Sequence, residues 1–126
     1  MMLSFTSAAP VSAAEQKVRV GFYSGDWNLT FDGTVKPDGP TRYTYDGYLY
    51  ADCPPGRFPA PRIALGHGAV SRGWQWEYDY CRTVQTHVWG EGERGAGDSV
   101  EFKVGANSGL AGVWQYGDSE AYDIGS

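Results

Sequence analysis

The segment Gly73-Trp-Gln-Trp-Glu-Tyr-Asp-Tyr-Cys81 decides the fold class that this chain is expected to adopt. Large rings and polar side chains alternate along it without a break, and the rings belong to Trp74, Trp76, Tyr78 and Tyr80. Strict alternation at a period of two is typical of a β-strand with one buried face. Four large rings on one face would fill much of a small core. We therefore expect the face that carries these rings to be buried.

Similar alternation, or a run of strand-forming residues, occurs on both sides of this segment, and no stretch shows the period of a helix. The expected strands cover residues 17–23, 27–35, 41–51, 62–65, 98–104 and 112–117. Residues 82–89 either continue the Trp-rich strand through a bulge or form a separate strand. About seven short strands separated by turns indicate a single-domain antiparallel β-sandwich, which could be jelly-roll-like, with a small β-barrel as the alternative.

The strands at 27–35 and 41–51 are expected to form a hairpin, because the Lys36-Pro-Asp-Gly-Pro40 segment between them is a strong turn signal. The second strand carries Tyr43 and Tyr45 on one face but Tyr48 and Tyr50 on the other. A sandwich buries one face of each sheet. One of these two pairs of tyrosines is therefore expected on the outer surface.

Residues 1–14 differ from the rest of the chain because they carry no charge and are rich in Ala and Ser. Ser12-Ala-Ala14 places small residues where a signal peptidase reads the chain, so cleavage before Glu15 is expected. We interpret residues 1–14 as the remnant of a secretory signal and residues 15–126 as one secreted domain. The alternative for residues 1–14 is a flexible arm.

The only two cysteines, Cys53 and Cys81, are expected to form a disulfide, since small secreted domains commonly depend on such bonds. The alternative is a pair of free buried thiols in a reducing compartment. The formal net charge is −5, and the ten basic residues are scattered singly. This charge pattern argues against a nucleic-acid partner and against an anionic membrane surface. No apolar run approaches the ~20 residues that a membrane-spanning helix needs.

Aromatic residues make up 15% of the chain, which is more than the core of a small sandwich needs on one face of each sheet. Tyrosine and tryptophan at a surface are favoured recognition residues, because a rigid apolar ring is joined to a polar group. In residues 82–89 the alternation sets His87 and Trp89 opposite the β-branched residues. The candidate binding residues are therefore Tyr48, Tyr50, His87 and Trp89.

Neither a metal site nor a cofactor is predicted. His67 and His87 are the only histidines, and the spacing of a zinc-binding helix motif is absent. His67, between two glycines, is expected in a turn, and His87 is expected on a solvated strand. Three Asp-Gly pairs could serve a structural calcium ion, although such pairs are common in turns and at bulges. They lie at residues 32–33, 38–39 and 46–47.

Two weak acid–base sets leave a hydrolase or nuclease as a third hypothesis. Glu77 and Asp79 lie two positions apart, as paired carboxylates for glycoside hydrolysis could. Glu77, Arg82 and His87 could cleave a phosphodiester by acid–base chemistry. We predict no catalytic residues. The expected function is a secreted binding module that recognises an extracellular protein through exposed aromatics. The alternative is polysaccharide binding through Trp89, Tyr48 and Tyr50.

Overall fold

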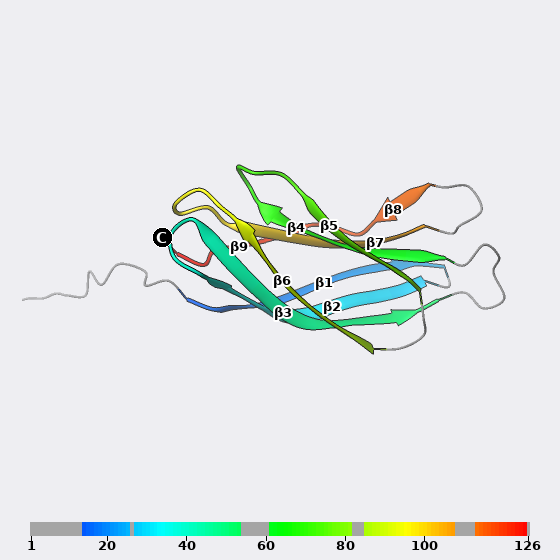
Figure 1. Ribbon diagram of the computed structural model, residues 1–126. Helices are drawn as coiled ribbons and strands as arrows, with labels where there is room; N and C mark the ends of the chain where they lie inside the picture. Colours follow the sequence, from blue (N-terminus) through cyan, green and yellow to red (C-terminus); the bar gives the residue numbers. More distant parts are fainter. Residues whose placement is uncertain (1–13, 26, 54–60, 82–84, 108–112, 126) are drawn as a thin grey trace, which may run out of the picture.

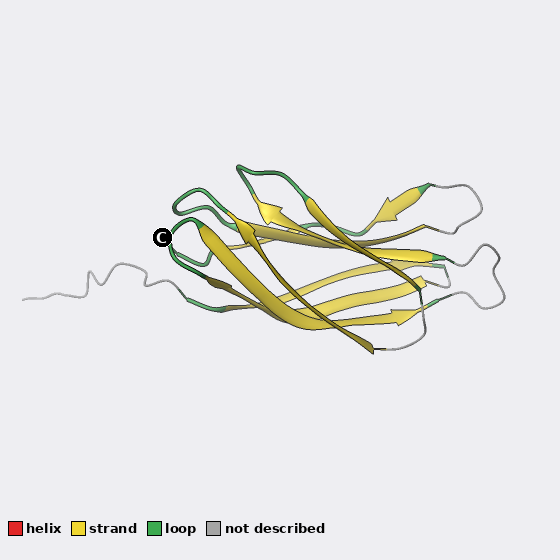
Figure 2. Cartoon of the chain, viewed as in Figure 1, coloured by secondary structure: helices red, strands yellow, loops and turns green. Residues whose placement is uncertain are grey.

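The computed structural model describes residues 14–25, 27–53, 61–81, 85–107 and 113–125. In these ranges the chain is all-β and contains no helix, so none of it could span a membrane as an apolar helix. Two antiparallel sheets face each other as a β-sandwich (Figures 1 and 2). The expected fold class and the single disulfide are confirmed.

Sheet A has the strand order β1-β2-β3-β6. Its strands are β1 (Gln16–Ser24), β2 (Trp27–Pro37), β3 (Arg42–Asp52) and β6 (Gln85–Glu93). The predicted hairpin is confirmed, because β2 and β3 pair in continuous register from Asn28 opposite Asp52 to Pro37 opposite Tyr43. Gly39 supplies the left-handed backbone of the connecting turn, with φ of 78°.

Sheet B has β4 and β7 at its centre and β5 at one edge. Its strands are β4 (Arg62–Ala69), β5 (Gln75–Tyr80), β7 (Val100–Asn107), β8 (Trp114–Tyr116) and β9 (Glu120–Tyr122). β8 and β9 pair with successive parts of β7, so together they act as one interrupted edge strand. Because β5 and β6 belong to different sheets, they are separate strands rather than one strand with a bulge. Arg82 lies between them, outside the described residues.

The core lies between the two sheets and consists of the inward faces of their strands. Phe31 of sheet A stacks on Phe102 of sheet B, with ring centroids 5.7 Å apart. Tyr45 meets Phe102 edge to face at 5.8 Å. The aliphatic part of the core comprises Val18, Val20, Leu29, Val35, Leu49, Ile63, Leu65, Val100, Val104 and Ile124.

The prediction that the rings of the Trp-rich segment fill the core is wrong. On β5 the polar residues are on the inner side, since Glu77 pairs with buried Leu65 and Asp79 pairs with buried Ile63. Residues paired across strands point to the same face, so the rings of Trp76 and Tyr78 lie on the outer face of sheet B. Alternation showed correctly that β5 has two different faces, but it did not show which face is buried.

Two of the Asp-Gly pairs lie within strands without forming either a turn or a bulge. Gly33 of β2 faces Gly47 of β3 in unbroken register. A Cβ atom at Gly33 would lie 2.3 Å from the backbone oxygen of Asp46, and one at Gly47 would lie 2.6 Å from the backbone oxygen of Asp32. Glycine is therefore required here because the two backbones approach closely.

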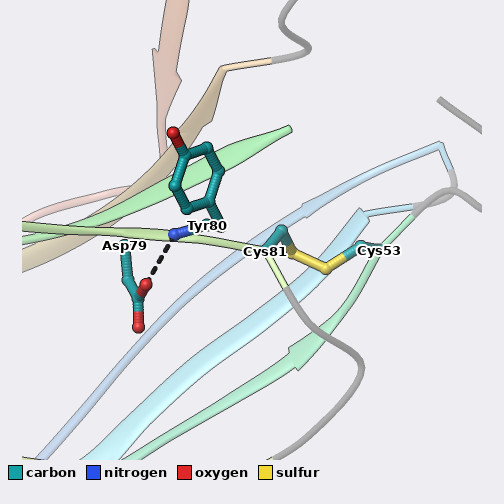
Figure 3. Close-up of a disulfide and its surroundings, with 4 residues drawn as sticks. All are labelled: Cys53, Asp79, Tyr80 and Cys81. Atoms are coloured by element: carbon teal, nitrogen blue, oxygen red, sulfur yellow. Dashed lines mark hydrogen bonds between the residues drawn. A yellow bond between two sulfur atoms is a disulfide. The ribbon is translucent and has the colours of Figure 1, made fainter. Parts of the chain in front are cut away.

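Different interactions stabilise the two open ends of the sandwich. The Cys53–Cys81 disulfide connects the end of β3 in sheet A to the end of β5 in sheet B (Figure 3), with Cα atoms 6.1 Å apart. At the other end the fully buried Arg94 side chain donates hydrogen bonds to four backbone carbonyl groups. These belong to Gly39, Arg42, Asp98 and Gly125. One side chain thus joins the β2–β3 turn, the β6–β7 loop and the C-terminal segment.

One long side of the sandwich is closed by direct contacts between β1 and the last strands. The Tyr122 hydroxyl accepts a hydrogen bond from the Arg19 amide at 3.0 Å and donates one to the Arg19 carbonyl at 3.1 Å. A Cβ atom at Gly117 would lie 1.9 Å from the Gly21 carbonyl oxygen, so the chains touch there. The opposite side is bounded by the edges of β5 and β6.

Candidate binding surfaces

The four predicted binding residues lie together on the outer face of sheet A, and we call them the sheet-A ring strip. Tyr48 pairs with His87 across β3 and β6, and Tyr50 and Trp89 follow on the same face. The His87 ring lies 5.1 Å from the Tyr48 ring and 4.7 Å from the Trp89 ring, measured between centroids. Exposure reaches 41% for Tyr48, 43% for Tyr50 and 65% for Trp89. The strip is therefore accessible to a partner.

Trp89 borders a shallow depression of about 370 Å³, and most of the residues that line it are polar or charged. The His87 ring beside Trp89 is held by a 2.9 Å hydrogen bond between Nε2 and Asp46 Oδ1. Because Asp46 both orients this ring and lines the depression, the sheet-A ring strip and the depression form one surface. The other residues at the depression include Glu15, Thr34, Lys36, Thr44 and Glu91.

A second group of rings covers the outer face of sheet B, and sequence reasoning missed it as a surface. We call Trp74, Trp76, Tyr78, Trp114 and Tyr116 the sheet-B ring layer. From Trp74, just before β5, and along β5 the rings follow one another at 5.8 and 6.4 Å, and along β8 at 6.3 Å. The two rows meet through Trp76 and Tyr116 at 5.1 Å and through Tyr78 and Trp114 at 5.4 Å. The five rings are therefore continuous.

Small residues on the central strands make room for this layer. A Cβ atom at Gly66 of β4 would lie 2.5 Å from the Trp76 ring, and one at Gly105 of β7 would lie 2.3 Å from the Tyr116 ring. Ala64 lies between Tyr78 and Gly105 in the register. The rings of the two edge strands thus lean inward over the centre of the sheet. A usable signal was present in the sequence, because Ala64, Gly66 and Gly68 alternate with much larger residues.

Two cations lie against these rings. The Lys103 ammonium is 4.3 Å from the Trp74 ring centroid, 4.9 Å from that of Tyr116 and 5.4 Å from that of Trp76. The Arg62 guanidinium lies 5.6 Å from the Tyr78 ring centroid. Cation–π contacts at these distances are attractive and restrict the side chains involved. The sheet-B ring layer is therefore held in place before any partner arrives.

The expectation that His67 lies in a turn is wrong. β4 continues past Leu65 to Ala69, and His67 is one of its inward residues, with only 1% of its surface exposed. Its Nδ1 is 2.7 Å from the Tyr43 hydroxyl, and its ring lies 4.4 Å from that of Tyr45. Burial lowers the pKa of His67 to about 4 and raises the pKa of Tyr43. His87, in contrast, lies on a solvated strand face as predicted.

The residues of the two acid–base sets are only partly brought together. Glu77 and Asp79 share the inner face of β5, and Glu77 lines the same pocket as His87. Arg82 lies outside the described residues, so its position relative to Glu77 and His87 is not described. Over the described ranges, no group of three or more His, Cys, Asp or Glu side chains gathers as a metal ion would require.

Comparison with family models, with curated proteins and with solved structures finds no match to this chain.

Proposed function

We propose that this chain is a secreted, non-catalytic binding module that recognises an extracellular protein through exposed aromatic side chains. The observation that carries the proposal is the continuous sheet-B ring layer. The cores of protein interfaces are enriched in Tyr, Trp, Phe, Met and Arg, and a few such residues supply most of the binding energy. This layer has that composition, with Arg62 and Lys103 already against the rings. The disulfide is compatible with an oxidising, extracellular setting.

The geometry also favours binding because the rings are fixed. Large side chains that are already ordered lose little conformational entropy when a partner covers them. Tyr78 is 50% exposed and Tyr80 is 59% exposed, so both rings offer area that a partner could bury. Arg62 lies near both rings, at 5.6 Å from the Tyr78 centroid and 5.9 Å from the Tyr80 centroid.

The test is affinity capture from the culture medium of the producing organism, with the secreted protein immobilised and retained proteins identified by mass spectrometry. The double variant Tyr78→Ser/Tyr80→Ser removes two exposed rings of sheet B. Val70→Ser is the matched control, because Val70 is an exposed apolar residue in a turn outside the ring layer. We expect the wild type and the control to retain the same stoichiometric partner and the double variant to bind it at least about tenfold more weakly. Equal retention by all three would overturn the proposal.

Polysaccharide binding is the second candidate, and the depression beside Trp89 favours it. A sugar offers an apolar face that stacks on an aromatic ring and hydroxyl groups that need hydrogen-bond partners. Trp89 is the most exposed large apolar side chain among the described residues, and Asp46, Thr44 and Lys36 lie at the adjoining depression. If this candidate is correct, the protein sediments with an insoluble polysaccharide, and Trp89→Ala weakens that binding at least about tenfold. Unchanged sedimentation of the variant would exclude Trp89 as the sugar platform.

A further inference from the structure

The side of the sandwich between β5 and β6 contains an unfilled pocket. In the described part of the chain β5 pairs only with β4 and β6 pairs only with β3, so the two sheet edges face each other unpartnered. A cavity of about 160 Å³ lies between them. A cavity of about 150 Å³ is large enough for one benzene-sized group. The pocket therefore has room for one side chain, not for a large ligand.

The walls of this pocket combine apolar side chains with carboxylates. Leu49, Ile63, Leu65 and Val88 supply the apolar part, and Glu77 and Asp79 lie along the β5 side. Figure 3 shows the Asp79 and Tyr80 side chains leaving β5 in opposite directions, so Asp79 is on the face opposite the rings. Glu77 is near enough to the core for its negative charge to raise the pKa of Tyr45 in addition to the effect of burial.

We infer that this pocket accepts the side chain of one Arg or Lys from an extended segment of the protein partner, whose backbone pairs with the free edge of β6. This inference rests on the proposed function. Arg and Lys bury a flexible apolar stem while their cationic group seeks an anion or water. Here the stem would contact Leu65 and Val88, and the cation would reach the carboxylate of Glu77, which lines the pocket. Charge-assisted hydrogen bonds of this kind are about twice as strong as neutral ones.

β6 is the better edge for the partner's backbone. It extends over nine residues, whereas β5 extends over six. An added strand presents alternate side chains to opposite faces. One set would point into the pocket, while the other would lie beside His87 and Trp89 of the sheet-A ring strip. The opposite side of the sandwich offers no such place, because Tyr122 is hydrogen-bonded to the backbone of Arg19 there.

The test uses an N-acetylated, C-amidated octapeptide of alternating Thr and Arg, and a second octapeptide with Gln in every Arg position. Binding to the intact, disulfide-bonded protein is followed by NMR of backbone amides and by calorimetry. We expect the Arg peptide to shift the amides of β5 and β6, and the Gln peptide to bind about tenfold more weakly or not at all. The double variant Glu77→Gln/Asp79→Asn should weaken Arg-peptide binding by a similar factor.

A control variant that loses the same charge elsewhere distinguishes binding in the pocket from general attraction of the cationic peptide to an acidic protein. Asp118 and Glu120 are exposed and lie by β9, at the edge of sheet B opposite to β5. Asp118→Asn/Glu120→Gln removes the same charge far from the pocket, so it should change the affinity for the Arg peptide by only about twofold. Equal losses in both double variants, or amide shifts that avoid β5 and β6, would overturn the inference.

The failure of this inference can be distinguished from failure of the proposed function. If Glu77→Gln/Asp79→Asn leaves peptide binding unchanged while Tyr78→Ser/Tyr80→Ser abolishes capture of the natural partner, the pocket is rejected and the binding function stands. If no ring variant affects capture, the proposed function itself is rejected. Folding of each variant is checked by the dispersion of its amide spectrum before binding is measured.

Discussion

His67 is the buried titratable residue with the clearest consequence for stability. Its ring is enclosed by Tyr43, Tyr45 and Phe102, and its Nδ1 contacts the Tyr43 hydroxyl. Adding a proton there would place a cation among aromatic rings where water cannot solvate it. The native state therefore holds this histidine neutral over a wider range of pH than the unfolded chain does.

Stability is predicted to fall as the pH is lowered from about 6.5 to about 4. In the unfolded chain the histidine has a pKa of about 6.5, whereas in the native state burial lowers the pKa of His67 to about 4. Between these values the unfolded state binds a proton that the native state does not. This difference costs about 3 kcal/mol of unfolding free energy by pH 4, and the loss from His67 levels off just below that pH. Urea unfolding at stepped pH values measures it.

Substitutions can assign this pH dependence to one histidine. His67→Gln removes the buried titrating group and should flatten the stability profile between pH 6.5 and 4. If His67→Gln does not fold, the wild-type ring resonances of His67 can be titrated directly. A native pKa near 6.5 for His67 would contradict the prediction. Asp98, whose pKa is lowered by the Ser71 hydroxyl, affects stability only at still lower pH.

The position of an individual residue could be predicted from the sequence where the strand around it alternates regularly. His87 was expected on a solvated strand, and alternation separated Tyr48 and Tyr50 from Tyr43 and Tyr45 without showing which pair faces outward. Arg94 was missed because it lies in a Gly-rich stretch that resembles a flexible loop. Arginine is rarely buried without partners. Its backbone carbonyl partners come from segments far apart in the chain, and a linear pattern cannot reveal them.

At the scale of elements, hydrophobic alternation identified the Trp-rich strand but assigned its faces wrongly. The rule that large rings are buried assumes that the opposite face meets solvent. β5 is an edge strand whose polar face lies toward the pocket between the sheets, and its rings cover the small residues Gly66 and Gly105. Which face of an edge strand carries its rings toward solvent depends on the neighbouring strand and on the size of that strand's side chains. Both are tertiary facts, so the sequence of β5 alone could not settle the question.

The fit between Trp76 and Gly66 is open to a direct test. Gly66→Ala is predicted to destabilise the protein by about 1–3 kcal/mol, because the added methyl group would overlap the Trp76 ring and force it to move. In a Trp76→Ala background the same substitution should be neutral or slightly stabilising, since the space is then free and alanine restricts the unfolded chain. Urea unfolding of the wild type, both single variants and the double variant gives the coupling energy.

This cycle also distinguishes ring contact from backbone effects. If Gly66→Ala lowers the unfolding free energy equally with and without the Trp76 ring, then the requirement for glycine comes from the backbone. The contact between Gly66 and the Trp76 ring is then not the cause. Tryptophan fluorescence provides a second readout, because a displaced Trp76 ring should change its emission while the fold is retained. A coupling energy near zero together with unchanged fluorescence would contradict the arrangement of the sheet-B ring layer.

At the scale of the whole molecule, the sequence was sufficient for the class of fold. Many short strands, turn signals and two cysteines predicted a sandwich closed by one disulfide, and the structure confirms both. The allocation of strands to sheets was not predictable. β3 and β4 lie in different sheets, as do β5 and β6, and the patterns of the strands themselves do not indicate these changes of sheet. Because the Cys53–Cys81 bond joins the end of β3 in sheet A to the end of β5 in sheet B, it holds the two sheets together at that end of the sandwich.

Removing the disulfide is therefore predicted to lower the unfolding free energy of the domain and to loosen the β5–β6 side most. The bond closes a loop across 28 positions, for which the chain-entropy model gives about 3–4 kcal/mol. Urea unfolding of Cys53→Ser/Cys81→Ser should show a loss of this size, and the variant's midpoint should not respond to reductant, whereas that of the wild type should. The β5–β6 side has no cross-sheet latch equivalent to the Tyr122–Arg19 hydrogen bonds among the described residues. Hydrogen exchange in the variant should therefore accelerate most in β5 and β6. Uniform acceleration, or an unchanged midpoint, would show that the bond is not what holds this side of the sandwich together.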